Sequence, residues 1–542
     1  MRYTRFGIPL RVTPLSSTSI LLAEPVGGIN LTQPASDLPP GQAADSVNWV
    51  TKQGFLEKRG MLQSRSTQSV VIPAPILGGF EGVQVSGAAI PFASTATRPV
   101  WYSAGSWSYS SYVSAYGTNV PPSASSASYW DLTQIYSPTV DENVVVMANQ
   151  SWQTLFVQQL GTNVFSTLTG APQARCVAAF DSFLVAMNVL EGSANYVQRV
   201  QWSDRGSYSS WTGGLSGFVD LLDMQGQGTR LVPQDSLLLA FSDREVWGGR
   251  RVDYPFILDF QPLDRSVGAP HPWTVALTRA GTMWLGRDWN VYLLPMGEAK
   301  ARKVGDAIQR RIAGEIDLPE RATAAYNPET DHYELWYPVI GGNGRCQRGA
   351  FFDLRSGAWS PQALDASLDV SKVWQGTLGA TSASTTWSSA SAAGLTWAAA
   401  TGSWQGQFGA TNAGPPATYA GSSGGTLYTF DTSATSDAGV TVEARWRSGG
   451  LGGEEPGRTK TVTEIRVDYE AQSASSLTVR VSPDQGASFV AGQRLHLPTA
   501  STESQVVSHQ FVNARYPVVE ICSETGRPKV ARLWVHTRRQ GR

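Results

Sequence analysis

The sequence has few charged residues. Asp, Glu, Lys and Arg make up 16% of its 542 residues, whereas ordinary soluble domains carry about 25%. The 42 basic and 43 acidic residues nearly cancel, so the formal net charge is -1. A dedicated nucleic-acid-binding domain normally has a strongly basic balance. The composition therefore argues against that class of function.

Cysteine and histidine are scarce as well. Cys176, Cys346 and Cys522 lie far apart, and no CxxC pair exists. The odd count leaves at least one thiol unpaired within the chain, which argues against a disulfide framework or a zinc ribbon. The five histidines show neither HExxH nor HxxxH spacing, the spacing of common metal sites. We expect no metal and no cofactor, and we expect each cysteine to be a small buried hydrophobic side chain.

Long hydrophobic runs are absent from the sequence. The N-terminal stretch MRYTRFGIPLRVTPLSSTSILLAEP is interrupted by Pro and Arg, so it lacks the continuous apolar segment of a signal peptide. No run approaches the ~18 apolar residues needed to span a bilayer. We expect a chain without a membrane-spanning segment that is made and folded in a cytoplasm.

What the sequence contains instead is glycine, tryptophan and many short apolar runs. It has 54 Gly and 19 Trp, and runs such as NVVVMA and DHYELWYPVI are separated by Gly, Asn, Asp and Pro. This pattern predicts strands and hairpins. Helical periodicity is best developed in VGDAIQRRIAGEI (304–316), with Asp306 as its expected cap. The sequence therefore predicts an all-β fold.

The length predicts more than one unit, because a single core usually stops growing at roughly 250–300 residues. Aromatic residues recur near strand ends, which is typical of a β-propeller, with a large β-sandwich as the alternative. These aromatic residues are Trp202, Trp247, Trp284, Trp336, Trp359 and Trp374. We predict an N-terminal arm (1–26), a propeller-like body (27–435) and a C-terminal β-sandwich (436–542).

The composition changes inside the predicted body, at residues 378–425. Small residues dominate this stretch, and Trp387, Trp397 and Trp404 interrupt them. Tryptophans bury large areas when they pack, so we interpret the stretch as an irregular excursion held to the scaffold by its indoles. A loop that contacts a neighbouring subunit is the alternative.

One short motif has a defined geometry. Ser482, Asp484, Gly486 and Phe489 fit the Asp-box pattern S-x-D-x-G-x-x-[FW]. We expect Asp484 to accept backbone N–H bonds, Gly486 to adopt a positive φ and Phe489 to pack under the turn. Asp-boxes occur in sialidases as folding devices remote from the chemistry, so we assign these residues a structural role.

Catalytic motifs are not evident. The sequence has no GxSxG, no Walker loop and no GxGxxG opening a helix. A glycosidase needs two carboxylates across a cleft, which spacing along one sequence cannot reveal. We therefore expect no catalytic residues and a protein that is not an enzyme. The Asp-box and the many tryptophans leave a carbohydrate-binding or sialidase-like propeller as the alternative.

Basic residues cluster in two places. One cluster contains Lys300, Arg302, Lys303, Arg310 and Arg311, and the other is the C-terminal ARLWVHTRRQGR. Such clusters are usually solvated faces. An acidic neighbour or passing nucleic acid is the functional alternative.

The segment GGINLTQPASDLPPGQAADSVNWVTKQGFLEKRG (27–60) resembles the start of tail nozzle and related β-propeller virion proteins of tailed bacteriophages. The matching positions are Gly27, Gly28, Ile29, Pro34, Asn48, Gly54, Leu56, Lys58, Arg59 and Gly60. The resemblance continues, in order, in RVQWSDRGSYSSWTGG (199–214), in 235–294, in 326–360 and in KTVTEIRVDY and VRVSPDQGASF near the C-terminus. Residues 65–170 fit this family poorly.

The resemblance implies a ring, commonly of six copies, in the tail or the head–tail neck of a virion assembled in the host cytoplasm. The genome would leave through this ring. The implied partners are copies of the chain itself, neighbouring tail, adaptor or portal proteins, and DNA that passes through the lumen without sequence-specific binding. A receptor-binding protein at the tail tip is a further role in this class. Residues 27–60 would be an extended strap that completes the propeller's first sheet or docks on an adaptor.

Overall fold

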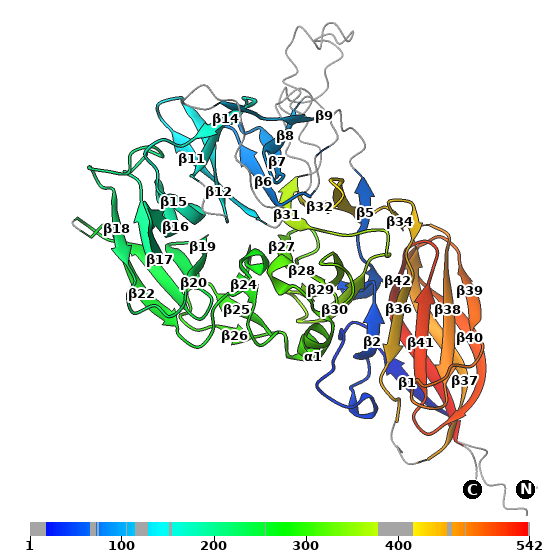
Figure 1. The fold of residues 1–542 in the computed structure, drawn as a ribbon. Coiled ribbons are helices and arrows are strands. Elements are labelled where there is room, and N and C mark those ends of the chain that lie inside the picture. The colour runs from blue at the N-terminus through cyan, green and yellow to red at the C-terminus, as the bar shows by residue number, and fades with distance from the viewer. Residues whose placement is uncertain are drawn as a thin grey trace, which may run out of the picture. The chain divides into compact units, whose positions relative to one another are not determined.

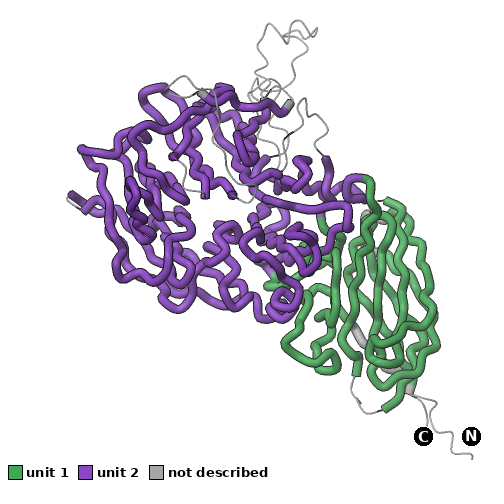
Figure 2. The backbone as a smooth tube through the Cα atoms, in the orientation of Figure 1, with its two compact units in different colours: residues 1–59, 356–362, 439–542 green, residues 60–355, 363–438 purple. Residues whose placement is uncertain are grey.

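The structure is a computed structural model that describes residues 18–64, 72, 75–103, 106–113, 128–150, 154–254, 256–377, 416–452, 458–471 and 473–539. Strands dominate it, and the α-helix in this part of the chain is α1 (Asp306–Glu315). The predicted all-β class is confirmed. The chain divides into two compact units (Figure 2). Unit 1 is Met1–Arg59, Ser356–Gln362 and Gly439–Arg542, and unit 2 is Gly60–Arg355 and Ala363–Ala438.

Unit 2 consists of small, mainly antiparallel sheets that follow one another along the chain. Its described residues form seven such sheets. The first three contain β6 (Gly78–Val83), β7 (Ala89–Ser94), β8 (Pro99–Ser103) and β9 (Ser106–Tyr109); β10 (Ser111–Val113), β11 (Trp130–Ser137), β12 (Glu142–Asn149), β13 (Phe156–Gln159) and β14 (Val164–Thr167); and β15 (Gln173–Phe180), β16 (Phe183–Glu191), β17 (Ala194–Trp202) and β18 (Gly217–Asp220).

The remaining sheets of unit 2 follow the same plan. They contain β19 (Gly228–Gln234), β20 (Leu237–Ser242), β21 (Val246–Arg251) and β22 (Leu258–Asp264); β23 (Ala276–Thr278), β24 (Gly281–Leu285), β25 (Val291–Pro295) and β26 (Arg302–Lys303); β27 (Thr323–Asn327), β28 (His332–Pro338), β29 (Cys346–Asp353) and β30 (Trp359–Ala363, assigned to unit 1 except for its last residue); and β31 (Lys372–Thr377), β32 (Pro416–Gly421), β33 (Leu427–Asp431) and β5 (Met61–Ser64). Short elements between them are η2 (Pro272–Thr274), η3 (Pro319–Arg321) and β34 (Ser436–Asp437).

The sheets of unit 2 stand around a common centre (Figure 1). The strands β6, β11, β15, β19, β23, β27 and β31, one from each sheet, all line the same central cavity. Apolar clusters fill the spaces between neighbouring sheets; one joins the third and fourth sheets, and another joins the seventh to the first. This arrangement is a β-propeller, and the predicted propeller-like body is confirmed.

The seventh sheet takes its outer strand from a distant part of the chain. β5 precedes the first sheet in sequence, yet it pairs antiparallel with β33, from Ser64 opposite Tyr428 to Met61 opposite Asp431. The Leu62 amide also donates to Asp437 Oδ1 at 2.8 Å. Hydrogen bonds and packing therefore join the two ends of the propeller.

Five of the six aromatic residues noted in the sequence lie buried in successive sheets of the propeller. They are Trp202, Trp247, Trp284, Trp336 and Trp374. They occupy the third strand of two sheets, the second strand of two others and the first strand of the last. This drift explains why the sequence shows no strict repeat. The sixth, Trp359, belongs to unit 1.

Unit 1 is a β-sandwich of two antiparallel sheets. One has the order β3-β4-β42-β37-β40, with β1 also on β42, and the other has the order β2-β36-β41-β38-β39. Its elements are β1 (Thr18–Ala23), η1 (Ala35–Asp37), β2 (Ala43–Val47), β3 (Trp49–Lys52), β4 (Phe55–Lys58), β30 (Trp359–Ala363, its last residue in unit 2), β35 (Val440–Thr441), β36 (Ala444–Ser448), β37 (Lys460–Ala471), β38 (Ser475–Ser482), β39 (Gln493–Leu497), β40 (Ala500–Ala514), β41 (Val518–Ser523) and β42 (Pro528–Arg539). The predicted C-terminal sandwich is confirmed.

The division of the chain differs from the one expected, because residues 27–59 belong to the sandwich. β2 pairs with β36, and β4 meets β42. The side chains of Trp49 and Leu56 complete the sandwich core. The strap therefore does not complete the propeller's first sheet; β5, which follows it, completes the last sheet. The local sequence of a short polar strand does not indicate which distant strand it pairs with. The sequence analysis therefore missed the pairing of residues 27–59 with the sandwich.

Two further expectations concern local structure. α1 lies within the expected range, and it buries Ile308 and Ile312 one turn apart. Its cap is Gly305, because Asp306 Oδ1 instead accepts a bond from Asn290 Nδ2 at 2.6 Å. Of the excursion 378–425, residues 378–415 with Trp387, Trp397 and Trp404 lie outside the described residues. Residues 416–425 form β32 and the turn that follows it.

Candidate functional site: the central cavity of the propeller

The central cavity of unit 2 has a volume of about 500 Å³. The strands that line the cavity run in the same direction along it, because residues near the start of one strand contact residues near the start of another, and residues near the ends contact each other. Asp131 and Arg230, near the starts of β11 and β19, form an ion pair, and Glu81 and Thr377, near the ends of β6 and β31, are hydrogen-bonded. The cavity therefore has a start end and a far end with different chemistry.

The start end carries a charged cluster made of Asp131, Arg230 and Lys372. Arg230 Nη1 lies 2.8 Å from Asp131 Oδ1, and Asp131 Oδ2 accepts the Val177 amide at 3.1 Å. Asp131 is 2% exposed and Lys372 is 7% exposed. Lys372 Nζ lies 4.4 Å from the centre of the Trp273 ring. The cluster thus brings two basic side chains and one carboxylate together in a largely buried place.

Burial sets the protonation of this cluster. It lowers the pKa of Lys372 far below its usual value; the Arg230 charge lowers it further and Asp131 opposes the shift. Burial also raises the pKa of Asp131, and Arg230 opposes that rise. Both directions follow from the cost of a charge in a medium of low polarity. An added negative charge here would favour the ammonium form of Lys372.

The far end of the cavity presents a carboxyl group. Glu81 Oε2 accepts the Thr377 amide at 2.6 Å and the Thr377 hydroxyl at 3.0 Å. Burial raises the pKa of Glu81, and these two bonds oppose the rise. A carboxyl group with a raised pKa can bind a hydroxyl group or act as a general acid.

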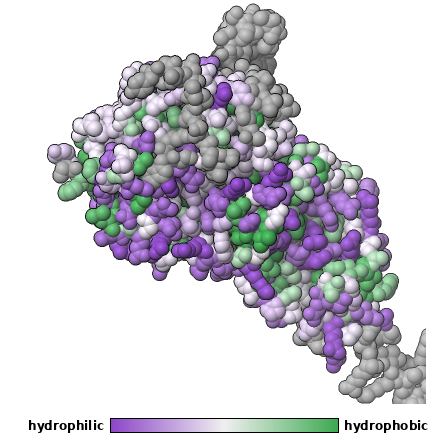
Figure 3. All heavy atoms as spheres, in the orientation of Figure 1, coloured by the Kyte–Doolittle hydropathy of each residue, from purple (hydrophilic) through white to green (hydrophobic). Residues whose placement is uncertain are grey.

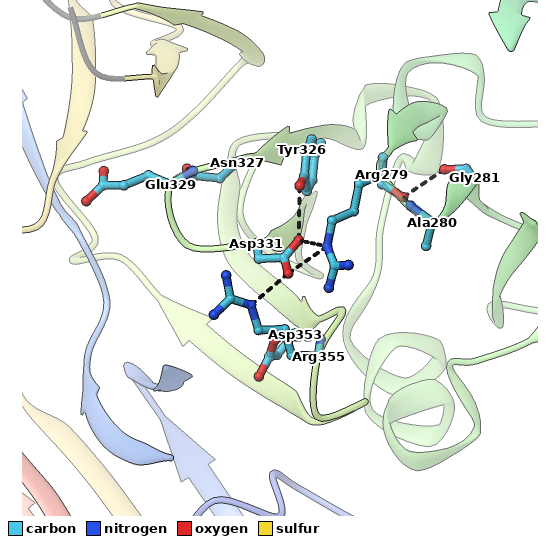
Figure 4. A network of polar contacts seen from close by, with 10 residues as sticks. Arg279, Ala280, Gly281, Tyr326, Asn327, Glu329, Asp331, Asp353 and Arg355 are labelled. Carbon is cyan, nitrogen blue, oxygen red and sulfur yellow. Dashed lines mark hydrogen bonds and ion pairs between the residues drawn. The ribbon is translucent and has the colours of Figure 1, made fainter. Parts of the chain in front are cut away.

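Tyr326 links the far end to a network between the fifth and sixth sheets (Figure 4). Its hydroxyl donates to Asp331 Oδ1 at 3.0 Å, and Asp331 also accepts bonds from Arg279 Nε (2.6 Å) and Arg355 Nε (3.0 Å). Burial and the bond to Asp331 raise the pKa of Tyr326 to about 12. Burial acts to raise the pKa of Asp331, but the two arginines hold it below its usual value. Because its oxygens are occupied, Asp331 is a structural clamp.

A smaller cavity of about 220 Å³ adjoins the start ends of the first, sixth and seventh sheets. Its lining includes Tyr129, Arg321, Cys346 and Ser371. The Tyr129 hydroxyl donates to the Ser371 carbonyl at 3.2 Å. The Tyr129 ring centre lies 5.9 Å from Lys372 Nζ, so the lining of the smaller cavity comes close to the charged cluster.

The Asp-box forms the turn between β38 and β39 of the sandwich. Asp484 Oδ1 accepts bonds from the Ser482 hydroxyl (2.7 Å) and the Ser488 amide (2.8 Å), and Gly486 has φ +95°. Hydrogen bonds from Ser488 and Ser482 lower the pKa of Asp484 to about 2. Phe489 is half-buried beneath the Arg447 guanidinium, 4.8 Å from ring centre to Cζ. The turn lies in the other unit from the central cavity.

The residues that carry the N-terminal resemblance lie together in unit 1. Gly28 has φ +69°, and a Cβ at this position would lie 2.7 Å from the Trp359 amide nitrogen. Gly27 is also crowded, since a Cβ there would lie 2.9 Å from Gln42 Cγ. These glycines let residues 27–29 run against the segment 356–362, where the Ile29 amide donates to the Trp359 carbonyl.

Asn48, Lys58 and Arg59 form a buried joint. Asn48 has φ 61°, its Nδ2 donates to the Glu443 carbonyl at 2.9 Å, and its amide donates to the Pro361 carbonyl at 3.0 Å. Arg59 Nε lies 3.4 Å from Asn48 Oδ1, and Lys58 Nζ donates to the Val442 carbonyl at 3.1 Å. Lys58 and Arg59 are both 0% exposed. The joint holds three chain segments together that are distant in sequence.

The cysteines and the basic clusters noted in the sequence have structural roles or lie at the surface. The three cysteines are buried and unpaired. In the first basic cluster, Lys303 pairs with Asp288 (3.1 Å) and Arg311 with Glu315 (3.0 Å). Arg538 and Arg539 lie at the end of β42. Among the described residues, no group of three or more His, Cys, Asp and Glu could hold a metal ion, and no helix is long and apolar enough to cross a membrane.

Sequence reasoning missed every residue of the charged cluster. Asp131, Arg230 and Lys372 each stand inside a short apolar run, in WDLT, GTRLVP and SKVW. A charge within a run that reads as a buried strand is the signal that could have revealed them, because such charges are rare unless they are paired. Their convergence on one cavity required the three-dimensional fold.

No family model and no curated protein matches the sequence. Solved structures match in fold. An exo-β-1,3-galactanase from Phanerochaete chrysosporium with galactose is 10% identical, with a TM-score of 0.29, over 88% of this chain and 100% of that one. YCF48 bound to D1 peptide is 11% identical, with a TM-score of 0.36, over 74% and 100%. The Pan2 WD40 domain of Neurospora crassa is 7% identical, with a TM-score of 0.32, over 67% and 96%.

These matches correct one expectation. We expected a protein that is not an enzyme, but several of the matched structures are exo-β-1,3-galactanases, which are enzymes. That expectation is therefore contradicted. At such low identity the likeness concerns the fold and transfers no activity. These matches do not test the resemblance to virion proteins.

Proposed function

We propose that this chain is a structural subunit of a tailed-bacteriophage virion and that copies of it assemble into a ring in the tail or the head–tail neck. The buried joint of Asn48, Lys58 and Arg59 is the observation that carries the proposal. These residues are also among those that carry the resemblance to virion propellers.

Full burial of a lysine next to an arginine is rare, because Lys and Arg are almost never fully buried unless they are paired. Here both side chains are 0% exposed, and Lys58 is satisfied by a carbonyl of another segment. Residues that only form a turn do not require a fully buried lysine and arginine. A sequence that shares these positions is therefore expected to share the strap and the sandwich that they build, which supports common architecture with the virion proteins.

The surface of the chain fits an assembly role. Large apolar side chains remain in water in unit 2, among them Phe218 (56% exposed), Leu222 (82%) and Tyr254 (79%). Figure 3 shows apolar patches separated by polar surface. Obligate assemblies commonly bury 2,000 Å² or more at an interface, and contacts between copies would cover such side chains.

Light scattering after size-exclusion chromatography tests this proposal. We expect the purified chain to form a defined multimer whose fraction rises with protein concentration. A mass of 58.3 kDa at every concentration, both alone and in extracts of a phage-infected host, would contradict the proposal.

A second candidate function is saccharide binding in the central cavity. Its supporting observation is the cavity of about 500 Å³ with Glu81 and Tyr326 at one end and the charged cluster at the other, since ligand pockets commonly measure about 300–1,000 Å³ and contain a few placed polar groups. The two candidates are compatible, because a tail protein can contact glycans at a host surface.

Titration of the purified chain with mono- and disaccharides, together with an assay for released reducing ends, tests the second candidate. We expect Glu81→Gln to lower turnover, because a glutamine amide can still bind a hydroxyl group but cannot donate a proton as a carboxylic acid does. Glu298→Gln, at an exposed ion pair outside the cavity, is the matched control. If no sugar binds to the wild-type chain, the second candidate fails while the first remains.

A further inference from the structure

We infer that the start end of the central cavity binds the carboxylate of an acidic sugar through Lys372 and Arg230. This inference rests on the proposed saccharide-binding role of the cavity and names the class of sugar. It arises from an imbalance of charge and of hydrogen bonds in the charged cluster.

The first step is the imbalance of charge. Protonation of Lys372 would give the cluster two cations and only one anion, Asp131, and burial disfavours that form while no further anion is present. A buried charge without a partner is costly. The rings of Trp273 and Tyr129 next to Lys372 relieve part of this cost through cation–π contact, which is weaker than an ion pair. A negative group at this place would balance the cluster.

The second step is the set of unused donors. The structure gives Lys372 Nζ no hydrogen-bond acceptor among the described residues, although the side chain is 93% buried and lines the cavity. Arg230 Nε is also buried and without an acceptor among these residues. An ammonium group offers three donors and a guanidinium a planar fork that matches a carboxylate. Lys372 and Arg230 both line the central cavity.

The third step concerns the rest of the ligand. The far end of the cavity offers Glu81, Tyr326 and Thr377, and Thr133 and Gln375 lie along the wall. Carboxyl, hydroxyl and amide groups of this kind bind sugar hydroxyls. The volume suits a small ligand and excludes a polymer such as duplex DNA. A carboxylate at one end with hydroxyls beyond it is the chemistry of a uronic acid.

Isothermal titration of the full chain with galacturonate and galactose tests the inference. The two sugars differ only at C6, which is a carboxylate in galacturonate and a hydroxymethyl group in galactose. We expect galacturonate to bind more tightly than galactose. Lys372→Met should weaken galacturonate binding by about 10- to 100-fold, the value of a charge-assisted hydrogen bond, and should thereby reduce the preference for galacturonate over galactose. Lys300→Met, at an exposed lysine, is the matched control and should change neither.

The outcomes separate the inference from the role on which it rests. Equal binding of the two sugars would overturn the acidic-sugar inference and preserve saccharide binding. Binding of neither sugar would overturn both. Inorganic phosphate binding as tightly as galacturonate would also overturn the sugar assignment. If Lys372→Met fails to fold, Lys372→Arg keeps the charge and should retain the preference for galacturonate.

Discussion

At the scale of single residues, burial decides what the charged side chains do. Burial and, to a smaller extent, the nearby Arg527 lower the pKa of Lys58 to about 8. The same lysine donates to the Val442 carbonyl, so it is a structural donor in the sandwich. Lys372, in the propeller, is also largely buried but lines a cavity. Similar burial therefore produces a joint in one unit and a candidate binding site in the other.

The pH dependence of stability tests the position of Lys58. Between about pH 8 and pH 10.5 the folded state has released the proton of Lys58 and the unfolded chain has kept it. In this pH range the unfolded state binds more protons than the folded state. The free energy of unfolding therefore increases as the pH rises from 8 to 10.5, and Lys58 contributes roughly 3 kcal/mol to that increase. Below pH 8 the lysine is charged in both states and its contribution no longer changes.

The measurement is urea unfolding of unit 1 at several pH values, in wild-type protein and Lys58→Met. Cysteines and tyrosines also titrate in this window, so the difference between the two proteins is the quantity that reports on Lys58. We expect that difference to change with pH from 8 to 10.5. A constant difference would show that Lys58 is not buried as described.

Asn48 offers a second test at this scale, since it has φ 61° and its side chain donates to the Glu443 carbonyl. Asn48→Gly loses the hydrogen bond but tolerates the backbone angle. Asn48→Ala loses the hydrogen bond and also tolerates the positive φ poorly. We expect it to be less stable than the glycine variant by about 1 kcal/mol. Denaturant midpoints of the two variants measure the difference. Equal midpoints would argue against a strained position at residue 48.

At the scale of elements, strand pairing between distant segments closes the propeller. β5 supplies the outer strand of the seventh sheet, and Met61 and Leu62 are both fully buried. The β5 strand covers the edge of β33, which would otherwise be free to pair with another chain. The integrity of unit 2 therefore depends on four residues located before its first sheet.

Leu62→Ala tests this closure. Removing a fully buried leucine side chain costs about 2–5 kcal/mol, and we expect unit 2 to unfold at a correspondingly lower denaturant concentration. Ser64→Ala, at the exposed end of the same strand, should have little effect. Similar small effects of both substitutions would mean that β5 does not hold the ring closed.

Much of the element level could be predicted from the sequence, and the limits have physical causes. Alternating runs such as 460–471 and the helical run around Ile308 and Ile312 depend on local periodicity, so their type was evident. The pairing of β2 with β36 and of β5 with β33 depends on contacts across hundreds of residues, which local patterns do not record. The charged cluster was missed for the same reason, because its members meet only when the ring closes.

At the scale of the whole molecule, the chain combines a propeller with a sandwich that contains the buried joint. Each unit has its own apolar core, so each can serve as a rigid part in a larger assembly. The strap contributes strands to the sandwich, and β5, which follows it, completes the propeller. The proposed virion role requires that copies of this two-unit chain associate.

Single-particle electron microscopy of the purified chain tests that central claim most directly. The account predicts closed rings of identical subunits around a common passage, with a propeller in every subunit. Particles that contain one copy of the chain under all conditions would contradict it.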